Sequence, residues 1–191
     1  MEAVPDMFNI LTLRDTIRIE PSKFGKPLEA AALEELKRKY EGLVDEDLGY
    51  VIKVIDLEVN PVGRIMPGDG GTHHQVLFTL LAFFPEMHEV VEGEVVEVAD
   101  FGVFLRIGPV DALLHVSQLM DDFISYDEKQ GVLRGKESGR AVTKGDILRV
   151  RIVAASFPSG RSSGKIGVTA RQPFLGKPEW IVEEVKKARG S

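Results

Sequence analysis

A short stretch with the alternation of a strand, residues 102–107, carries the side chains best suited to binding a nucleic acid. Alternation in a β-strand places its three aliphatic residues on the core side and Phe104 and Arg106 on the solvent side. An exposed aromatic ring beside a cation is an arrangement on which bases stack, at about 1–3 kcal/mol per base. Phe101, just before the stretch, extends the same platform.

Residues 147–153 show the same alternation with a basic outer face. The inner positions are aliphatic, whereas Arg149 and Arg151 share the outer side, as in a groove that follows a phosphate backbone. The residues alone leave a second interpretation open. In that interpretation Phe104 packs beneath the loop after Tyr126, and the arginines form a solvated face that neutralises an acidic first strand.

The formal charge of −6 is unusual for a nucleic-acid binder, but the charge is unevenly distributed. Residues 85–128 contain one basic side chain, Arg106, against eleven acids, whereas residues 129–177 contain eleven basic side chains against two acids. The overall balance therefore conceals an acidic segment followed by a basic one.

Other chemistries lack the residues that they need. Cysteine is absent, which excludes disulfides, thiolate metal sites and cysteine nucleophiles. His73 and His74 are adjacent, so in a strand they point to opposite faces, and nothing completes a metal site around the paired carboxylates Asp121 and Asp122. The glycines of residues 68–71 fit a nucleotide-clamping pattern that joins helices, whereas strand patterns flank them here. We expect no cofactor, no metal and no enzymatic activity of the chain itself.

The first half of the chain, residues 1–84, predicts a small α+β domain. Apolar residues recur four apart between residues 28 and 40, which indicates a helix with one buried stripe. Strand patterns cover residues 8–19, 50–59 and 76–84, and a loop rich in glycine and proline covers residues 61–71. We expect one helix on the face of a small sheet.

The second half, residues 85–191, predicts an all-β domain. The expected strands cover residues 90–99, 102–107, 112–116, 147–156 and 165–169. Five short strands of this spacing suit a closed OB-fold barrel, which leaves no exposed edge and often carries oligonucleotides. Residues 127–140 are expected to be a polar insertion, and residues 178–189 a short terminal helix.

Residues 93–105, GEVVEVADFGVFL, and residues 114–119, LHVSQL, resemble the S1 RNA-binding domain. The resemblance implies RNA contacts from two aromatic residues that flank a glycine and from a histidine after the third strand. In this sequence those positions are Phe101, Phe104 and His115. The basic residues expected to contact RNA are Arg106, Arg149, Arg151 and Lys165.

Motifs in both halves extend the resemblance to the whole chain. They are KYEG at 39–42, GDG at 68–70, IGP at 107–109, HVSQ at 115–118 followed by MDD at 120–122, and RQPFLG at 171–176. Together they resemble a family of RNA polymerase subunits that contains the archaeal E-prime subunit and the seventh subunit of the eukaryotic enzymes.

This resemblance implies a non-catalytic subunit of a DNA-directed RNA polymerase whose first domain has a truncated ribonucleoprotein-like fold. It implies a tip loop, mapped to residues 63–72, that docks on the core RNA polymerase, a stable partner in the small F subunit of RNA polymerase, and a barrel that binds exiting single-stranded RNA. A glycine-rich loop allows positive φ angles and close backbone approach, although without the family it fits an ordinary hairpin turn equally well. The docking residues expected in the loop are Gly63, Pro67, Gly68, Asp69, Gly70 and Gly71.

Two other functions stay open at this point. One is a stand-alone or exosome-cap S1 protein, although such caps usually add a KH domain or a cysteine zinc ribbon, and neither is visible. The other is a purely structural stalk whose barrel contacts protein factors.

No apolar run reaches the roughly 18 residues of a membrane span, and the lack of cysteine fits a reducing interior. We therefore expect a cytoplasmic protein without membrane contact.

Overall fold

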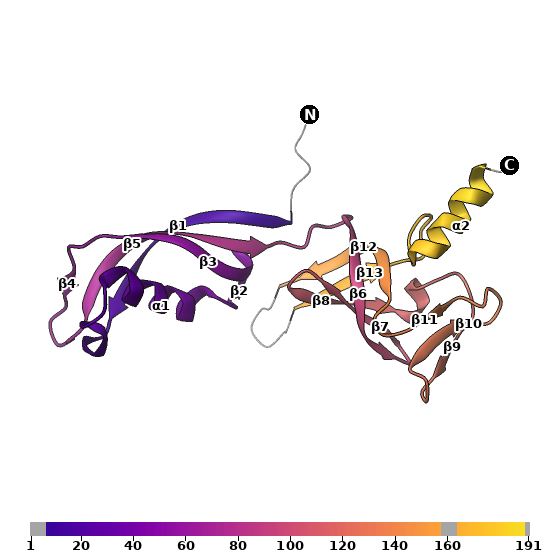
Figure 1. Cartoon of the computed structure of the whole chain (residues 1–191), viewed down its shortest axis with the longest axis horizontal. Coiled ribbons are helices and arrows are strands. Elements are labelled where there is room, and N and C mark those ends of the chain that lie inside the picture. The colour runs from indigo at the N-terminus through magenta and orange to yellow at the C-terminus, as the bar shows by residue number, and fades with distance from the viewer. Residues whose placement is uncertain (1–6, 158–163, 190–191) are drawn as a thin grey trace. The chain divides into compact units, whose positions relative to one another are not determined.

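A computed structural model of the chain describes residues 7–157 and 164–189 (Figure 1). The chain divides into two compact units, one that ends at Phe84 and one that begins at Pro85. Each unit has its own sheet system and its own buried residues, and each is described separately below.

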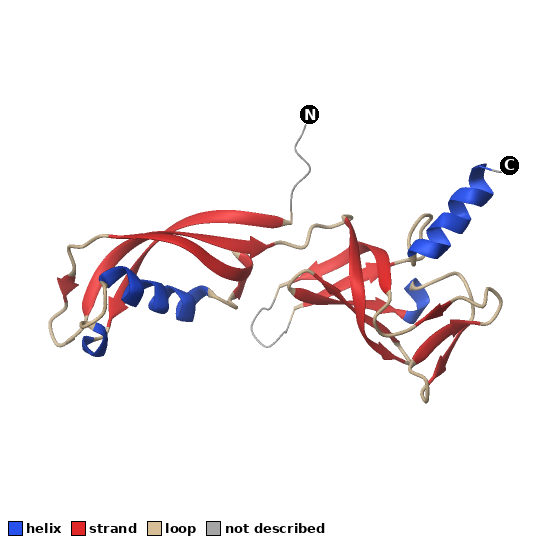
Figure 2. Ribbon diagram, in the orientation of Figure 1, coloured by secondary structure: helices blue, strands red, loops and turns tan. Residues whose placement is uncertain are grey.

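Unit 1 is an antiparallel sheet with a helix along one face (Figure 2). Its strands follow the order β1-β5-β3-β2, and the short β4 pairs with β5. The elements are β1 (Phe8–Ile19), the 3-10 turn η1 (Pro21–Lys23), α1 (Leu28–Tyr40), β2 (Val44–Asp45), β3 (Gly49–Val59), β4 (Arg64–Ile65) and β5 (Thr72–Phe83).

The core of unit 1 forms where the apolar stripe of α1 meets the sheet. Ala32 and Leu36 are completely buried in one cluster with Phe78 and Leu80 of β5. The ring of Tyr40, one turn further along α1, lies 4.9 Å from that of Phe78. The helix therefore forms where residues four apart share a buried face, as expected.

β5 begins at Thr72, four residues before the strand expected from residue 76. His73 and His74 are polar, so hydrophobicity does not mark them as strand residues. Backbone pairing with Arg18 and Ile17 of β1 nevertheless extends the strand over them. This longer β5 carries the sheet to the base of the glycine-rich loop.

Unit 2 contains a closed barrel in the order β12-β13-β8-β7-β6, which confirms the expected OB-type fold. Its interior is aliphatic, with Val103, Leu105, Val150 and Ile152 fully buried. The elements are β6 (Val90–Ala99), β7 (Gly102–Ile107), β8 (Val110–His115), the 3-10 turn η2 (Val116–Gln118), β9 (Ile124–Asp127), β10 (Val132–Gly135), β11 (Ala141–Val142), β12 (Ile147–Ser156), β13 (Lys165–Thr169) and α2 (Pro178–Arg189).

The polar insertion expected over residues 127–140 overlaps a second, three-stranded sheet in the order β11-β10-β9. These strands contain two to four residues each, too short for a periodic pattern to appear in the sequence. Leu133 and Val142 are nevertheless completely buried, so the segment adds its own core to unit 2.

Asp122 stabilises the turn that follows β10 through hydrogen bonds. Its carboxylate accepts bonds from the backbone N–H groups of Glu137 and Ser138 and, at 2.7 Å, from the hydroxyl of Ser138. The Ser138 hydroxyl first, and then these backbone donors, lower the pKa of Asp122 from 3.8 to about 2. The carboxylate is therefore the form that the fold requires.

Replacing Asp122 with Asn should destabilise unit 2 near neutral pH, because an amide oxygen accepts hydrogen bonds less strongly than a carboxylate. A carboxyl group with a lowered folded pKa contributes stability above its unfolded pKa and loses it as the pH falls through the folded value. The stability difference between Asp122→Asn and the unaltered chain should therefore shrink between about pH 4 and about pH 2. Melting followed by the fluorescence of Trp180, the one tryptophan, measures it. An equal difference at both ends of this range would contradict the role of Asp122.

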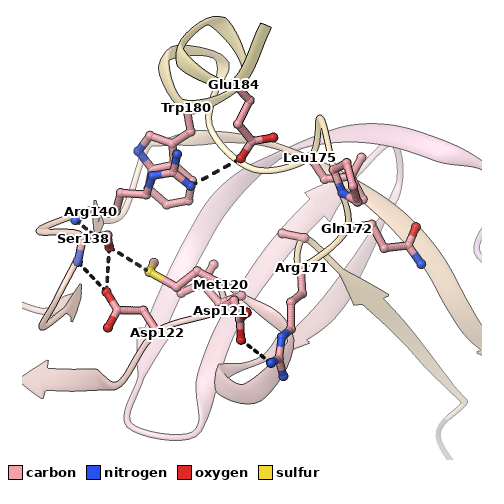
Figure 3. Close-up of a pocket in the computed structure, with 13 residues that line it drawn as sticks. Met120, Asp121, Asp122, Ser138, Arg140, Arg171, Gln172, Leu175, Trp180 and Glu184 are labelled. Atoms are coloured by element: carbon pink, nitrogen blue, oxygen red, sulfur yellow. Dashed lines mark hydrogen bonds and ion pairs between the residues drawn. The ribbon is translucent and has the colours of Figure 1, made fainter. Parts of the chain in front are cut away.

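α2 is held to unit 2 through its first turn. Trp180 is buried, and the guanidinium of Arg140 lies over its ring at 5.1 Å while pairing with Glu184 (Figure 3). Next to the helix, Lys177 pairs with Asp146 at 2.6 Å. Trp180 and Arg140 line a pocket of about 290 Å³.

Across residues 7–157 and 164–189, no helix has the length and apolar character to cross a membrane.

Candidate nucleic-acid interface

The outer face of β7 and β8 carries the two rings and the histidine singled out above. Val103 and Leu105 point inward and are buried, so Phe104, between them, faces outward and is half-buried. The antiparallel register pairs Phe104 with Leu113 and Gly102 with His115. Phe104 and His115 thus occupy the same side of two neighbouring strands.

Phe101 extends this face at the turn between β6 and β7. The residue is 45% exposed, and its ring meets that of Phe104 edge to face, with centroids 6.1 Å apart and planes at 85°. The carbonyl of Phe101 accepts the N–H of Val116, which fixes the turn against η2. Two rings at right angles offer stacking surfaces in two directions.

His115 is exposed and has its ring oriented by Ser117. Its Nδ1 accepts the backbone N–H of Ser117 at 3.2 Å and lies 2.8 Å from the Ser117 hydroxyl. A backbone N–H can only donate, so Nδ1 must be an acceptor and the neutral ring carries its proton on Nε2. His115 therefore presents an N–H donor beside the rings.

Gly102 allows β7 and β8 to approach closely at this face. Its φ of 153° is one that residues with a side chain rarely adopt. A Cβ there would overlap the carbonyl oxygen of Leu114 and lie 2.9 Å from the Cα of His115. The glycine between the two phenylalanines is thus required by backbone packing.

Arg106 shares the outer side of β7 with Phe104 but is already paired. Its Nε donates to Asp111 at 2.7 Å and a second guanidinium nitrogen donates to the same carboxylate at 3.1 Å. Glu94 of β6 lies opposite Arg106 in the register. Asp111 raises the pKa of Arg106, so the positive charge persists but is balanced locally.

The other predicted cations are distributed over two parts of the barrel. Lys165 is exposed at the start of β13, the strand that pairs with β8. Arg149 lies on β12 and pairs with Glu92 of β6 at 2.9 Å. Arg151 is half-buried, with a buried Nε that lacks a hydrogen-bond partner among the described residues.

The barrel therefore brings Phe101, Phe104 and His115 together and separates them from Arg149. For Arg149 the geometry matches the interpretation in which later arginines neutralise acids of an earlier strand. The RNA contacts themselves stay predictions. Ser117 was missed as an orienting residue, although its position two residues after the histidine, inside the HVSQ motif, could have indicated it.

The loop expected to dock is tied to its own domain by several residues. Gly71 is buried between Arg18 and the backbone of Ile19, and a Cβ on Gly63 would lie 2.5 Å from the His74 ring. These two glycines are thus explained by packing within unit 1.

Gly68 has a φ of 83°, which forms the turn, and the nearby Pro67 and Gly70 are not buried.

The histidines and acids of the described residues do not assemble a metal site. His73 contacts Asp69 at 2.9 Å, and the ring of His74 lies 2.9 Å from the carbonyl of Asn60. The two rings therefore make separate structural contacts.

Two family models match the chain, one in each unit. Residues 14–70 match the SHS2 domain found in the N terminus of Rpb7p/Rpc25p/MJ0397, and residues 85–155 match the S1 RNA-binding domain. The molecule is thus an SHS2 domain followed by an S1 RNA-binding domain, which agrees with the α+β and barrel folds expected.

Curated relatives identify the family. The chain is 41% identical to DNA-directed RNA polymerase subunit Rpo7 of Saccharolobus shibatae, over 94% of this chain and all of the relative. It is 28% identical to RNA polymerase II subunit RPB7 of Saccharomyces cerevisiae, over 76% of this chain and 86% of that protein. It is 27% identical to RNA polymerase III subunit RPC8 of Bos taurus, over 87% and 86%. The chain belongs to this family of RNA polymerase subunits, and it is a polymerase subunit rather than an enzyme by itself.

Proposed function

We propose that the chain is a stalk subunit that docks on the core RNA polymerase, pairs with the small F subunit of RNA polymerase and binds single-stranded RNA as it leaves the enzyme. Docking would use the loop that contains Gly63, Pro67, Gly68, Asp69, Gly70 and Gly71, and RNA would use the barrel. We place this assembly in the cytoplasm.

The observation that carries the RNA part is the outer face of β7 and β8. Two phenylalanine rings at 85° and the N–H donor of His115 lie together on the barrel of an S1 domain. Stacking accepts every base, so binding should show little sequence preference. Lys165, on the strand next to β8, would supply charge toward phosphates, so affinity should fall as salt rises.

The docking part is supported by the ordered loop at one end of unit 1. The loop is joined to the sheet through β4 and through its ties to Arg18 and His74, so it keeps a defined shape. It also exposes aliphatic side chains, whose burial would favour binding to a protein surface.

Assembly can be tested by co-expressing the full chain with a small polymerase subunit of the F class and mixing the product with core enzyme prepared without either. We expect a stable pair by size and mass, and its retention on the core during gel filtration. In a stalled transcription complex, the RNA that exits from the enzyme should crosslink to unit 2. A chain that stays alone and elutes apart from the core, while still binding RNA, would favour a stand-alone S1 protein instead.

A further inference from the structure

The loop between β3 and β5 exposes large apolar side chains although it is firmly held. Val62, Ile65 and Met66 are 75%, 71% and 49% exposed. Val62 and Met66 both line a groove of about 230 Å³ beside His73. Aliphatic groups fixed in contact with water are costly unless a partner covers them, so their rigid placement requires an explanation.

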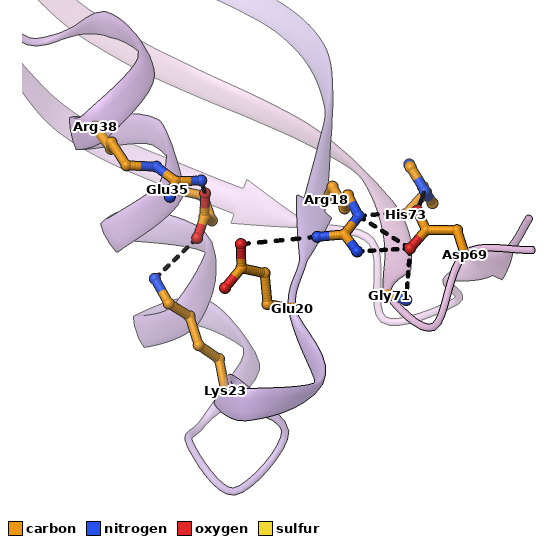
Figure 4. A network of polar contacts seen from close by, with 8 residues as sticks. All are labelled: Arg18, Glu20, Lys23, Glu35, Arg38, Asp69, Gly71 and His73. Carbon is orange, nitrogen blue, oxygen red and sulfur yellow. Dashed lines mark hydrogen bonds and ion pairs between the residues drawn. The ribbon is translucent and has the colours of Figure 1, made fainter.

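One end of the loop is fastened by Asp69. Its carboxylate accepts bonds from Nε and a terminal nitrogen of Arg18, at 2.8 and 2.6 Å, and lies 2.9 Å from His73 (Figure 4). It also accepts the backbone N–H of Gly71 at 2.9 Å. Arg18 first, then Gly71 and His73, hold the pKa of Asp69 well below its usual range.

The other end of the loop is fastened by His74, which is buried. One ring nitrogen lies 2.9 Å from the carbonyl of Asn60, and the other lies 3.1 Å from the Thr72 hydroxyl. Gly63 packs directly on the ring, with no room for a Cβ. The apolar residues thus lie on a segment that is held at both ends. His73 and His74 of β5 and Arg18 of β1 make these contacts.

We propose that Asp69 is a latch that holds this loop in one conformation, so that Val62, Ile65 and Met66 form a preformed anchor for an apolar pocket on the core polymerase. The inference rests on the proposed docking of the loop. Asp69 acts as a positioning residue: it points back to β1 instead of outward. A preordered loop binds more tightly because its conformational entropy is already lost on folding, so less is lost on docking.

The arrangement of unit 1 separates this role from general stability. The core of the unit lies between α1 and the sheet, and Asp69, Val62 and Ile65 lie outside it. Releasing the latch should therefore free the loop while leaving the core intact. Without the Asp69 contacts the loop would hold its docking conformation for only a fraction of the time, and its apparent affinity for the core would be the intrinsic affinity multiplied by that fraction.

The test compares a latch variant with an anchor variant in the full chain, with affinity for core enzyme prepared without this subunit as the first readout. Asp69→Ala should weaken docking about tenfold and speed hydrogen exchange of the backbone amides of residues 62–66, which do not donate to the removed carboxylate. Ile65→Asp should weaken docking at least as much without changing that exchange. Arg18→Lys keeps the positive charge but loses the two guanidinium donors to Asp69, so it should weaken docking to an intermediate degree. Glu46→Ala, an exposed acid at the β2 end of the sheet, is the matched control and should change neither readout.

The outcomes separate the two proposals. If Ile65→Asp weakens docking and Asp69→Ala does not, the latch is wrong and docking by the loop stands. If Asp69→Ala weakens docking without faster exchange, Asp69 contacts the core directly, and the latch is again wrong. If Ile65→Asp and a Val62→Asp variant both bind the core normally, the loop does not dock, and the proposed function fails together with the latch.

Discussion

Removing both rings, by Phe101→Ala together with Phe104→Ala, is expected to weaken binding of single-stranded RNA by at least about 25-fold. Each ring offers a surface for a base at about 1–3 kcal/mol, so losing two costs at least about 2 kcal/mol. The barrel should stay folded, because neither ring belongs to the fully buried core. Fluorescence anisotropy with a labelled oligouridine at low salt measures the effect.

The matched control is Phe24→Ala, which removes a phenylalanine of similar exposure, 53%, from unit 1. It should leave RNA affinity within about twofold, because a single exposed ring outside the interface has no base to stack on. A double variant that binds RNA as tightly as the unaltered chain would show that bases do not stack on this face. The alternative of a purely structural stalk would then gain support.

Gly102→Ala is expected to destabilise the barrel by about 2–5 kcal/mol. A φ outside the range of residues with side chains costs about 1–2 kcal/mol, and forcing a methyl group into packed backbone adds about 1–3. The new Cβ would meet Leu114 and His115 in the backbone of β8, which cannot move aside as a side chain could. Denaturant unfolding followed by Trp180 fluorescence reports on unit 2 alone.

Gly145→Ala separates the two causes in this prediction. Gly145 also has a positive φ, 88°, but a Cβ there would meet nothing within 4 Å. It should cost only the conformational part, about 1–2 kcal/mol. If both variants lose the same stability, close packing of β7 on β8 is not what requires Gly102.

The outward position of Phe104 could be predicted because strand alternation acts within the six residues of β7. Val103, Leu105 and Ile107 mark the inner side, and the side chains between them must face outward. The helix Leu28–Tyr40 was predictable for the same reason, since its buried residues recur within one short segment. Patterns of this kind need no knowledge of distant contacts.

Contacts between distant segments left no such pattern. Arg18 and Asp69 are 51 residues apart, and Arg149 and Glu92 are 57 apart, so neither pair is visible before the strands are aligned. The position of Arg149 shows the consequence. Alternation correctly placed it on the outside of β12, but only the closure of the barrel decided that its neighbour is the acidic β6 rather than the rings.

The small sheet β9–β11 escaped prediction for a different reason. Leu133 and Val142 are its fully buried members, and both lie among turn-forming and charged residues. Strands of two to four residues contain too few positions for alternation to be recognised. Their stability comes from packing and from the Asp122 carboxylate, which only the folded chain brings to the turn.

Photo-crosslinking locates the RNA on the intact chain most directly. A short RNA carrying one 4-thiouridine would be irradiated with the unaltered protein, and the joined peptides would be identified by mass spectrometry. Attachment should occur at Phe101, Phe104 or His115, and it should decline as salt is raised. Attachment confined to β12, to α2 or to unit 1 would contradict the assignment of the RNA-binding face to β7 and β8.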